Sequence, residues 1–419
     1  TGEEEADKND SSLIAHLPPP KWKMESLDLT LFGLAIFLFA GGCFHWFLHV
    51  LAILYGKWKL HRPTPAVPPE NLPGISVLKP LVGVDPHLFE NLESFFTLKY
   101  PAFELLFCIQ DEMDGALMVV KSLCQKYPNV DAKLFLGGKK VGVNPKINNM
   151  SIGYEAAKYD LIMISDSGLK MAPDTLLDMA LTLTDKVGLV HQMPYACSRK
   201  GIASHLEKVY FGSQHAKMYL CADVFRINCT TGMSCLMRKN VVEEAGGLKE
   251  FGQYLAEDFF LGQAFLDRGW RVKITSHPAM QNSGMYSISQ HHNRLVRWMK
   301  LRTAMLPLTM FLEPISQCMV MGAMVSWAVT YLFDWSPLMF FLGHVLVWFL
   351  LDYLQIKVIE NKLLPFSKFE YIVCWFLNEL SYLALIVQSH IDSTISWRGK
   401  KFRLRWGGYV EEIHTKQTV

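Results

Sequence analysis

Long apolar runs flank a central region of short ones along the chain. The first long run, residues 29–55, contains no Asp, Glu, Lys or Arg. A helix needs about 20 apolar residues to cross a bilayer, so we expect a transmembrane helix at 27–56. The run is too long for a cleaved signal peptide, and no small-residue cleavage site follows it. Three further hydrophobic segments fall within 301–390, near 314–333, 336–351 and 371–389.

Residues 74–300 show a different pattern, in which short apolar runs alternate with helix-like segments such as 86–97, 114–127 and 173–185. Five runs are expected as strands: ISVLKPL (75–81), FELLFCIQ (103–110), AKLFLGG (132–138), DLIMISD (160–166) and KVGLVHQ (186–192). Strands that are apolar throughout and alternate with helices favour a mainly parallel sheet. We therefore expect an α/β domain at 74–300, reached through a proline-rich linker at 57–73.

The composition is typical of a membrane protein. Half of the 419 residues are hydrophobic, and the net charge of +2 argues against a bulk nucleic-acid binder. The nine cysteines form no CxxC pair, which makes a zinc site or a disulfide framework a poor interpretation. Basic residues follow the first apolar run and precede the later ones, so the α/β domain is expected in the cytosol. They are Lys57, Lys59, Arg62, Arg294, Arg297, Lys300 and Arg302.

Acidic residues stand where strands of the predicted domain end. Asp111 and Asp114 follow the second predicted strand, Asp166 ends the fourth, and Asp258 lies in AEDFF. A single strand-end aspartate commonly caps the next helix, but three such sites indicate a ligand at the carboxyl edge of the sheet. For a nucleotide diphosphate, Asp166 would hold a Mg²⁺ or Mn²⁺ ion that neutralises the departing anion. Asp111 or Asp114 would hydrogen-bond the uracil or ribose. Asp258 would act as general base, with Glu257 as its rival.

Two other strings contain groups that suit phosphates. GGKKVGVNPKINNM (137–150) includes Lys146, although a plain solvated loop is the alternative. RLVRW would place one side of a helix against a ligand through Arg294, Arg297 and Trp298. Arginines bind phosphate oxygens and an indole stacks on a sugar, whereas a membrane-interface anchor has the same composition. The segment 201–224 is either an amphipathic helix on the bilayer or a helix of the domain core.

Several long strings, in order and in spacing, resemble the ceramide glucosyltransferases, which are inverting, family 2-like membrane glycosyltransferases with a GT-A fold. The strings are ISVLKPLVGVDPHLFENLESFF, KKVGVNPKINNM, YDLIMISDSG, VGLVHQMPY, TGMSCLMRK, AEDFF, AMQNSGMYSISQ and TISWRGKKFRLRWGG. The resemblance covers residues 27–410. It implies transfer of glucose from UDP-glucose to the primary hydroxyl of ceramide, with inversion, at the cytosolic face of the Golgi membrane.

The resemblance also assigns roles to residues. The three aspartates of the family fall on Asp114, Asp166 and Asp258, with Asp258 as the proton acceptor. The arginine form of (Q/R)xxRW falls on Arg294, Arg297 and Trp298. His191 in VGLVH is expected to contact UDP. DSG at 166–168 replaces the usual DxD, so metal binding would rest on one carboxylate, completed by the diphosphate and water.

Two other functions share part of this pattern. A processive polysaccharide synthase has the same aspartates and (Q/R)xxRW, but it needs a polymer channel built from more spans. A non-catalytic membrane scaffold would have no need of the acidic set. The sequence therefore favours the lipid glucosyltransferase.

At the C-terminus, the number of expected membrane spans and the distribution of basic residues predict opposite sides of the membrane for the tail. Three full spans after a cytosolic domain would place the tail at 391–419 in the lumen, yet it carries Arg398, Lys400, Lys401, Arg403 and Arg405. Basic segments of this kind normally stay in the cytosol. We therefore expect 336–351 or 371–389 to be re-entrant or interfacial, and the tail to pack near the α/β domain. Asp352 and Glu379 should face protein or headgroups rather than lipid tails. The acidic residues at 1–26 are expected to be disordered.

Overall fold

The computed structural model describes residues 21–285, 287–397 and 399–413. The predicted disordered tail at 1–26 lies outside the described residues, apart from the start of the first helix. That helix, α1 (Lys21–Lys59), extends beyond the predicted span of 27–56 at both ends. By their internal contacts the described residues divide into two units: 21–46 with Cys318–Val347, and Phe47–Gln317 with the remainder from Trp348.

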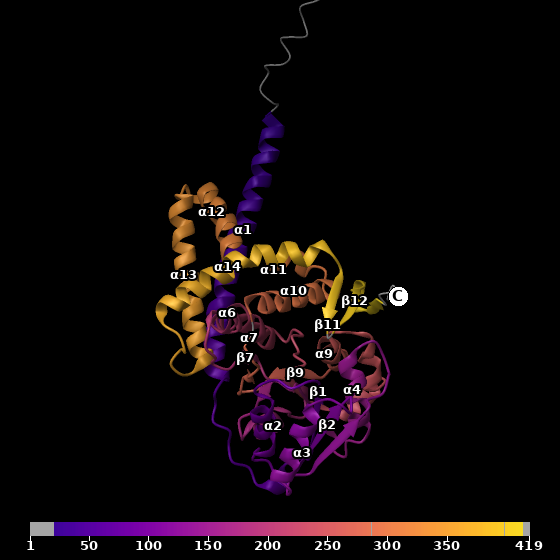
Figure 1. The fold of residues 1–419 in the computed structure, drawn as a ribbon. Helices are drawn as coiled ribbons and strands as arrows, with labels where there is room; N and C mark the ends of the chain where they lie inside the picture. Colours follow the sequence, from indigo (N-terminus) through magenta and orange to yellow (C-terminus); the bar gives the residue numbers. More distant parts are fainter. Residues whose placement is uncertain (1–20, 286, 398, 414–419) are drawn as a thin grey trace, which may run out of the picture. The chain divides into compact units, whose positions relative to one another are not determined.

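The larger unit is built on a seven-stranded sheet in the order β3-β2-β1-β4-β8-β6-β9 (Figure 1). Parallel pairs join β1 to β2 and β4, β2 to β3, and β6 to β9, while β8 pairs antiparallel with β4 and β6. The strands are β1 (Ile75–Leu81), β2 (Phe103–Ile109), β3 (Ala132–Leu136), β4 (Leu161–Ser165), β6 (Val187–His191), β8 (Ser234–Arg238) and β9 (Arg271–Ile274). The predicted α/β fold with a mainly parallel sheet is confirmed.

Helices cover both faces of this sheet, which explains why its strands are apolar throughout. Val77 and Leu105 point into one core, and their neighbours Leu78 and Leu106 point into the other, because successive side chains of a strand alternate between faces. The first core includes α2 (Leu88–Phe96), α3 (Ala116–Lys126) and α5 (Thr175–Thr182). The second includes α4 (Pro145–Glu155), α8 (Lys239–Glu244) and α9 (Glu257–Asp267).

The larger unit contains further elements outside the seven-stranded sheet and the helices on its faces. A small sheet is formed by β5 (Leu169–Lys170), β10 (Ala279–Gln281) and β7 (Pro194–Ala196). The segment 201–224 forms α6 (Ile202–Tyr210), a π-helical turn (Phe211–His215) and α7 (Ala216–Phe225). Short 3-10 turns lie at Pro69–Asn71, Leu248–Gln253 and Trp406–Gly408. The chain then continues through α10 (Ile288–Met305) and α11 (Thr309–Ile315).

Three helices of the described chain are long and apolar enough to cross a membrane. They are the part of α1 from Leu27 to Lys59, α13 (Pro337–Glu360) and α14 (Lys368–Ile391). The argument that 336–351 is too short to span is wrong, because α13 has 24 residues. A break falls instead in the segment 314–333, where α11 and α12 (Cys318–Phe333) are separate helices that would count as a further span only when taken together.

One face of α14 packs on α6 and α10 (Figure 1). That face buries Tyr371, Trp375, Tyr382 and Leu385, whereas Leu380, Leu383, Val387 and Ile391 are exposed. A helix with protein on one side and an open apolar surface on the other suits the membrane interface. The helix is also long and apolar enough to cross a membrane, so the re-entrant or interfacial placement expected for 336–351 or 371–389 stays a prediction.

The tail forms a sheet of its own, made of β11 (Thr394–Trp397), β12 (Lys400–Leu404) and β13 (Val410–Ile413). Its buried side chains, Ile395, Phe402, Leu404 and Val410, cluster with Leu255 of the α/β domain. Lys300 of α10 forms an ion pair of 2.6 Å with Asp392 at the start of the tail. The prediction that the tail packs on the α/β domain is confirmed.

Asp352 of α13 and Glu379 of α14 both face protein, as predicted. Asp352 is 3% exposed, lies 3.1 Å from Nε2 of His49 and accepts a hydrogen bond of 2.9 Å from Trp375 Nε1. Glu379 lines a small cavity beside α6 and α10 and has one carboxylate oxygen buried. An ionised group in hydrocarbon is costly, and these contacts avoid that cost.

The contacts of Asp352 predict a stability effect. Asp352→Leu should destabilise the protein by about 3–5 kcal/mol, since it leaves His49 and the Trp375 N–H without their buried acceptor. The double variant His49→Phe, Asp352→Leu should recover part of that loss, because both polar partners are then gone. Thermal unfolding in detergent measures both effects. A single variant that melts like the wild type would contradict the assignment, and the exposed Asp185→Leu serves as control.

Candidate active site

Lys146 is the centre of the polar groups at the carboxyl edge of the sheet. Its Nζ lies 2.9 Å from Oδ1 of Asp166 and 3.0 Å from Oε1 of Glu257, and it donates to the Gly232 carbonyl at 2.8 Å. These three partners account for the three donors of an ammonium group. The geometry therefore makes Lys146 a link between three segments, and its expected contact with the donor phosphates stays a prediction.

Local structure holds Lys146 in place. Asn144 caps α4 by accepting from the backbone N–H groups of Lys146 and Ile147, and Pro145 occupies the first turn. The Lys146 side chain is almost fully buried. Burial alone would lower the pKa of this lysine, but the carboxylates of Asp166 and Glu257 raise it by more, so its pKa lies above the ordinary value. Lys146 is thus a permanent cation inside the site.

Glu257 and Asp258 have different surroundings although they are neighbours on the first turn of α9. Glu257 is buried, and its two oxygens meet Lys146 Nζ and Nδ2 of Asn144, the latter at 2.9 Å. Asp258 is half-buried, and its oxygens accept from the backbone N–H groups of Gly232 at 2.6 Å and Phe259 at 2.9 Å. Glu257 is therefore committed to the protein, which favours Asp258 over its rival as the base.

Burial raises the pKa of the Asp258 carboxyl, and the negative charge of Glu257 raises it further, to about 6. Lys146 and the two backbone N–H groups act in the opposite direction and limit the shift. A base is most effective when its pKa lies near the working pH, because it is then both ionised and able to hold a proton. Asp258 meets that requirement close to neutrality.

Gly232 allows Asp258 and Lys146 to approach each other. A Cβ atom at this position would lie 3.1 Å from Cβ of Asp258 and 3.1 Å from Nζ of Lys146. The string TGMSC was noticed in the sequence only as part of a resemblance. There is a physical reason for Gly232 in this string. Its N–H donates to Asp258 and its carbonyl accepts from Lys146, so two side chains of opposite charge lie against its backbone.

Asp166 is held from two directions. Its Oδ1 faces Lys146, and its backbone carbonyl accepts a hydrogen bond of 2.7 Å from Nζ of Lys79. Its side chain is 41% exposed, so it is open to a ligand. Lys79 is fully buried in β1 with its Nζ 3.7 Å above the Phe95 ring, and burial lowers its pKa to about 7. Sequence reasoning missed Lys79, although a lysine inside the apolar run ISVLKPL was a signal.

Asp111 and Asp114 lie after β2 and bond to nearby backbone. Asp111 is exposed and accepts from the Met113 N–H at 2.9 Å. Asp114 accepts from the N–H of Ala116 at 2.9 Å and from that of Gly83 at 2.7 Å. Asp114 therefore ties the loop after β1 to the start of α3. In the described part of the chain the Asp111 carboxylate joins no two elements in this way, and it is the more exposed of the two.

A series of rings connects β6 to α10. His191 contacts the Tyr219 ring at 5.8 Å, Tyr219 contacts His215 at 4.9 Å, and His215 stacks on Trp298 at 5.7 Å. Burial lowers the pKa of His191 to about 4, so its ring is neutral at physiological pH. The predicted site residues His191 and Trp298 therefore belong to one packed array.

Arg294 and Trp298 share one side of α10, as their spacing predicted, with the guanidinium 4.5 Å from the indole ring. Arg294 donates to Oε1 of Glu207 at 2.9 Å and to Oε1 of Gln281 at 2.6 Å, and its expected contact with the donor stays a prediction. Arg297 is half-buried on the same helix. Sequence reasoning missed Glu207, which lies in the segment 201–224.

The segment 201–224 has its polar groups inside the protein. Glu207, Lys208 and His205 of α6 are buried, and α14 covers the helix. A helix lying directly on the bilayer would keep such groups in water. The described residues therefore favour the domain-core alternative for this segment.

Comparison with known proteins identifies the family. Residues 44–410 match glycosyl transferase family 21. The chain is 42% identical to ceramide glucosyltransferase 3 of Caenorhabditis elegans over 87% of this chain and 79% of that protein. It is 38% identical to ceramide glucosyltransferase 1 of the same organism, over 98% and 89% of the two chains.

A more distant likeness exists among solved structures. The mannosyltransferase PcManGT from Pyrobaculum calidifontis, solved in complex with GDP-Man and Mn2+, is 16% identical with a TM-score of 0.46, over 86% of this chain and 98% of that one. Similarity at this level carries no conclusion for the site. The family match covers most of the chain, and the two nematode relatives agree with it. The chain belongs to glycosyl transferase family 21, and over most of its length it is similar to proteins named ceramide glucosyltransferase.

Proposed function

We propose that the chain transfers glucose from UDP-glucose to the primary hydroxyl of ceramide and releases β-glucosylceramide and UDP. The observation that supports this most is the placement of Asp258, a half-buried carboxylate with a pKa of about 6, beside the exposed Asp166. Lys146 and Gly232 connect the two. The two relatives are named ceramide glucosyltransferase, which supports ceramide as the acceptor. UDP-glucose as the donor is proposed from the sequence resemblance.

The proposed chemistry is a single displacement. Asp258 takes the proton of the acceptor hydroxyl as its oxygen attacks the anomeric carbon from the face opposite UDP. One displacement inverts the configuration, so an α-linked donor gives a β-glucoside. Glu257 and Lys146 hold the first turn of α9 in place, which keeps the Asp258 carboxylate oriented by the Gly232 and Phe259 N–H groups.

We also propose that a Mg²⁺ or Mn²⁺ ion assists departure of UDP at Asp166. Among the residues that the structure describes, no group of three or more His, Cys, Asp or Glu side chains could hold a metal. Asp166 fits the role as a single exposed oxygen ligand, which suits these hard cations. The donor diphosphate and water would complete the coordination. The ion would stabilise the negative charge of the leaving UDP.

The location follows from the charges on either side of the apolar helices. We propose a multi-pass Golgi membrane protein with the domain of residues 74–300 in the cytosol. Lys57 and Lys59 end α1, and the basic tail packs on the α/β domain, and both observations support a cytosolic side for that domain. The Golgi assignment itself rests on the resemblance.

The first prediction concerns the base. Asp258→Ala should lower glucosyl transfer by about 10²–10⁴-fold while UDP binding persists, because proton removal in the transition state is lost. The matched control is Asp267→Ala, an exposed acid at the other end of α9. Transfer to labelled ceramide and binding of UDP by calorimetry are the measurements. Near-normal turnover in a folded Asp258→Ala protein would remove Asp258 from the mechanism.

The second prediction is a pH dependence. The base acts as a carboxylate, so kcat/KM should be constant above the pKa of Asp258, which is about 6, and fall about tenfold for each pH unit below it. The raised pKa means that this loss starts near pH 6 rather than near the value of an ordinary aspartate. A profile that stays flat down to pH 4.5 would show that the base is not this group.

The third prediction concerns the metal. Excess chelator should abolish transfer, and Asp166→Asn should raise the metal concentration needed for half-maximal activity by at least about tenfold. Asp160→Asn, an exposed acid that precedes the same strand, is the control. Activity that is unaffected by chelator would eliminate the ion from the reaction.

A further inference from the structure

A π-helical turn, Phe211–His215, joins α6 to α7. In a regular α-helix the Ala216 N–H would donate to the Gly212 carbonyl, four residues back. Here it donates to the Phe211 carbonyl, five residues back, so the Gly212 carbonyl is released from that bond. Turns of this kind are rare, and they are frequent at functional sites.

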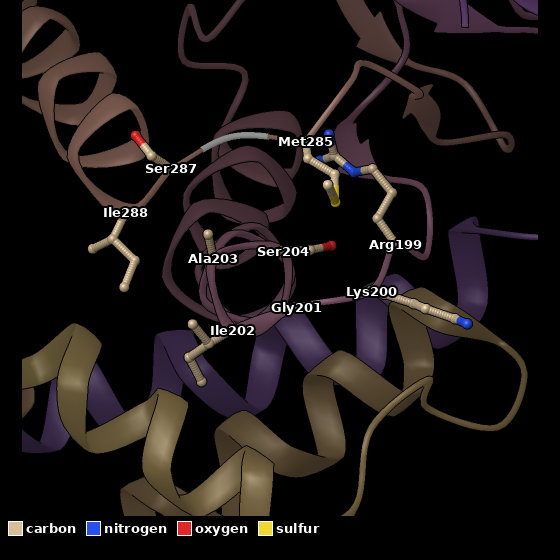
Figure 2. A pocket seen from close by; sticks show the side chains of 9 residues that line it. All are labelled: Arg199, Lys200, Gly201, Ile202, Ala203, Ser204, Met285, Ser287 and Ile288. Carbon is tan, nitrogen blue, oxygen red and sulfur yellow. The ribbon is translucent and has the colours of Figure 1, made fainter. Parts of the chain in front are cut away.

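Helices α6 and α10 run side by side from a common start. Figure 2 shows Ile202 of α6 and Ile288 of α10 among the residues that line one pocket. Further along, Glu207 of α6 forms an ion pair of 2.9 Å with Arg294 of α10. The π-turn follows α6 directly, and it meets α10 at the next turn of that helix, which carries Trp298.

Two rings of the π-turn pack on Trp298. The indole is stacked on His215, with 5.7 Å between the ring centroids, and it meets Phe211 edge-on at 5.9 Å. The Arg294 guanidinium lies 5.6 Å from the centroid of the Phe211 ring and 4.5 Å from that of Trp298. Contacts between rings, and between a cation and a ring, have preferred geometries. The position of the turn therefore restricts the orientation of Arg294 and Trp298, two of the predicted site residues.

Helix α13 holds the backbone of the same turn. Gln355 of α13 is fully buried, and its Nε2 donates to the carbonyls of Ser213 at 2.5 Å and Gly212 at 3.3 Å. The next residue, Ile356, packs so closely that a Cβ atom at Gly212 would lie 2.5 Å from the Ile356 Cγ1. Gln355 thus supplies a donor to the carbonyl that the π-turn released.

The surroundings of Gln355 indicate that its donors are required. A polar side chain is costly in an apolar helix such as α13 unless it faces protein partners. Among the described residues, the side-chain carbonyl oxygen of Gln355 is buried without a hydrogen-bond partner. A buried acceptor without a partner is destabilising, and an apolar residue of similar size would avoid that loss. The N–H groups are therefore the part of the amide that the fold uses.

We propose that Gln355 is a positioning residue for the transfer reaction. By holding the carbonyls of the π-turn, it keeps Phe211 and His215 against Trp298. The inference rests on the proposed function and adds to it a residue from outside the domain of residues 74–300. Gln355 acts through the turn and Trp298, not by contact with a substrate. The apolar helix α13 is then needed for catalysis as well as for attachment to the membrane.

A double-mutant cycle in full-length protein, assayed in proteoliposomes, tests this role. Gln355→Met keeps the length of the side chain and removes its N–H donors. It should lower kcat/KM for glucosyl transfer to ceramide about tenfold or more, since a misplacement of about 1 Å can cost about 10²-fold. In a Trp298→Leu background the same change should cost no more than about twofold, because the ring that the turn positions is gone. The control is Gln125→Met, which removes an exposed amide of α3 and should leave kcat/KM unchanged.

The outcomes separate this inference from the proposed function. Wild-type protein that fails to glucosylate ceramide would refute the function itself. Thermal unfolding shows whether each variant is folded. A folded Gln355→Met protein with the kcat/KM of the wild type would overturn the positioning role while the function stands. Losses that multiply in the double variant would overturn it as well, because they would show that Gln355 does not act through Trp298.

If Gln355→Met does not fold, Gly212→Ala replaces it. The added Cβ should push the turn away from Ile356 and lower kcat/KM about tenfold, with the Gln355 side chain intact. Ile356→Ala in the same protein makes room for the Cβ and should restore most of the transfer. A folded Gly212→Ala protein with the kcat/KM of the wild type, or one that Ile356→Ala does not restore, would overturn the inference.

Discussion

The contact between the Lys146 ammonium and the carboxylates of Asp166 and Glu257 is the constraint on which the site depends. A buried lysine is costly unless opposite charges and hydrogen bonds surround it, and Lys146 has two carboxylates and a carbonyl within 3.0 Å. Those partners come from the end of β4, the loop before β8 and the first turn of α9. Removing the cation would leave carboxylates of like charge facing one another across the same space.

The same set of charges determines how Asp258 behaves. Glu257 raises its proton affinity, and Lys146 and the Gly232 N–H lower it. The pKa of the half-buried Asp258 carboxyl is therefore raised by the charge of the buried Glu257 carboxylate. Lys79 supports the arrangement from behind, because it fixes the backbone of Asp166 while Lys146 fixes its side chain. Two lysines thus set the position of one aspartate, whose side chain remains 41% exposed.

The strands could be predicted because burial on both faces makes them uniformly apolar, a local property of runs such as DLIMISD. Asp166 and Asp258 could be identified because strand ends and motif strings are local as well. The partners of Lys146 could not, since Gly232 and Glu257 are 86 and 111 residues away along the chain and meet it only in the folded sheet. Hydropathy also missed the break between α11 and α12. It lies after α11 because a proline inside that helix, Pro314, and the polar Ser316 and Gln317 interrupt the run, which averaging over a window conceals.

The most direct test of the central claim is the pH profile of kcat/KM for Glu257→Gln. The substitution keeps the shape of the side chain and removes the negative charge that raises the pKa of Asp258. The account predicts a folded enzyme that retains most of its activity at pH 7.5, with its acidic limb displaced to lower pH than in the wild type. Loss of activity by about 10²-fold or more at every pH, in a protein that still binds UDP, would contradict it and make Glu257 the base.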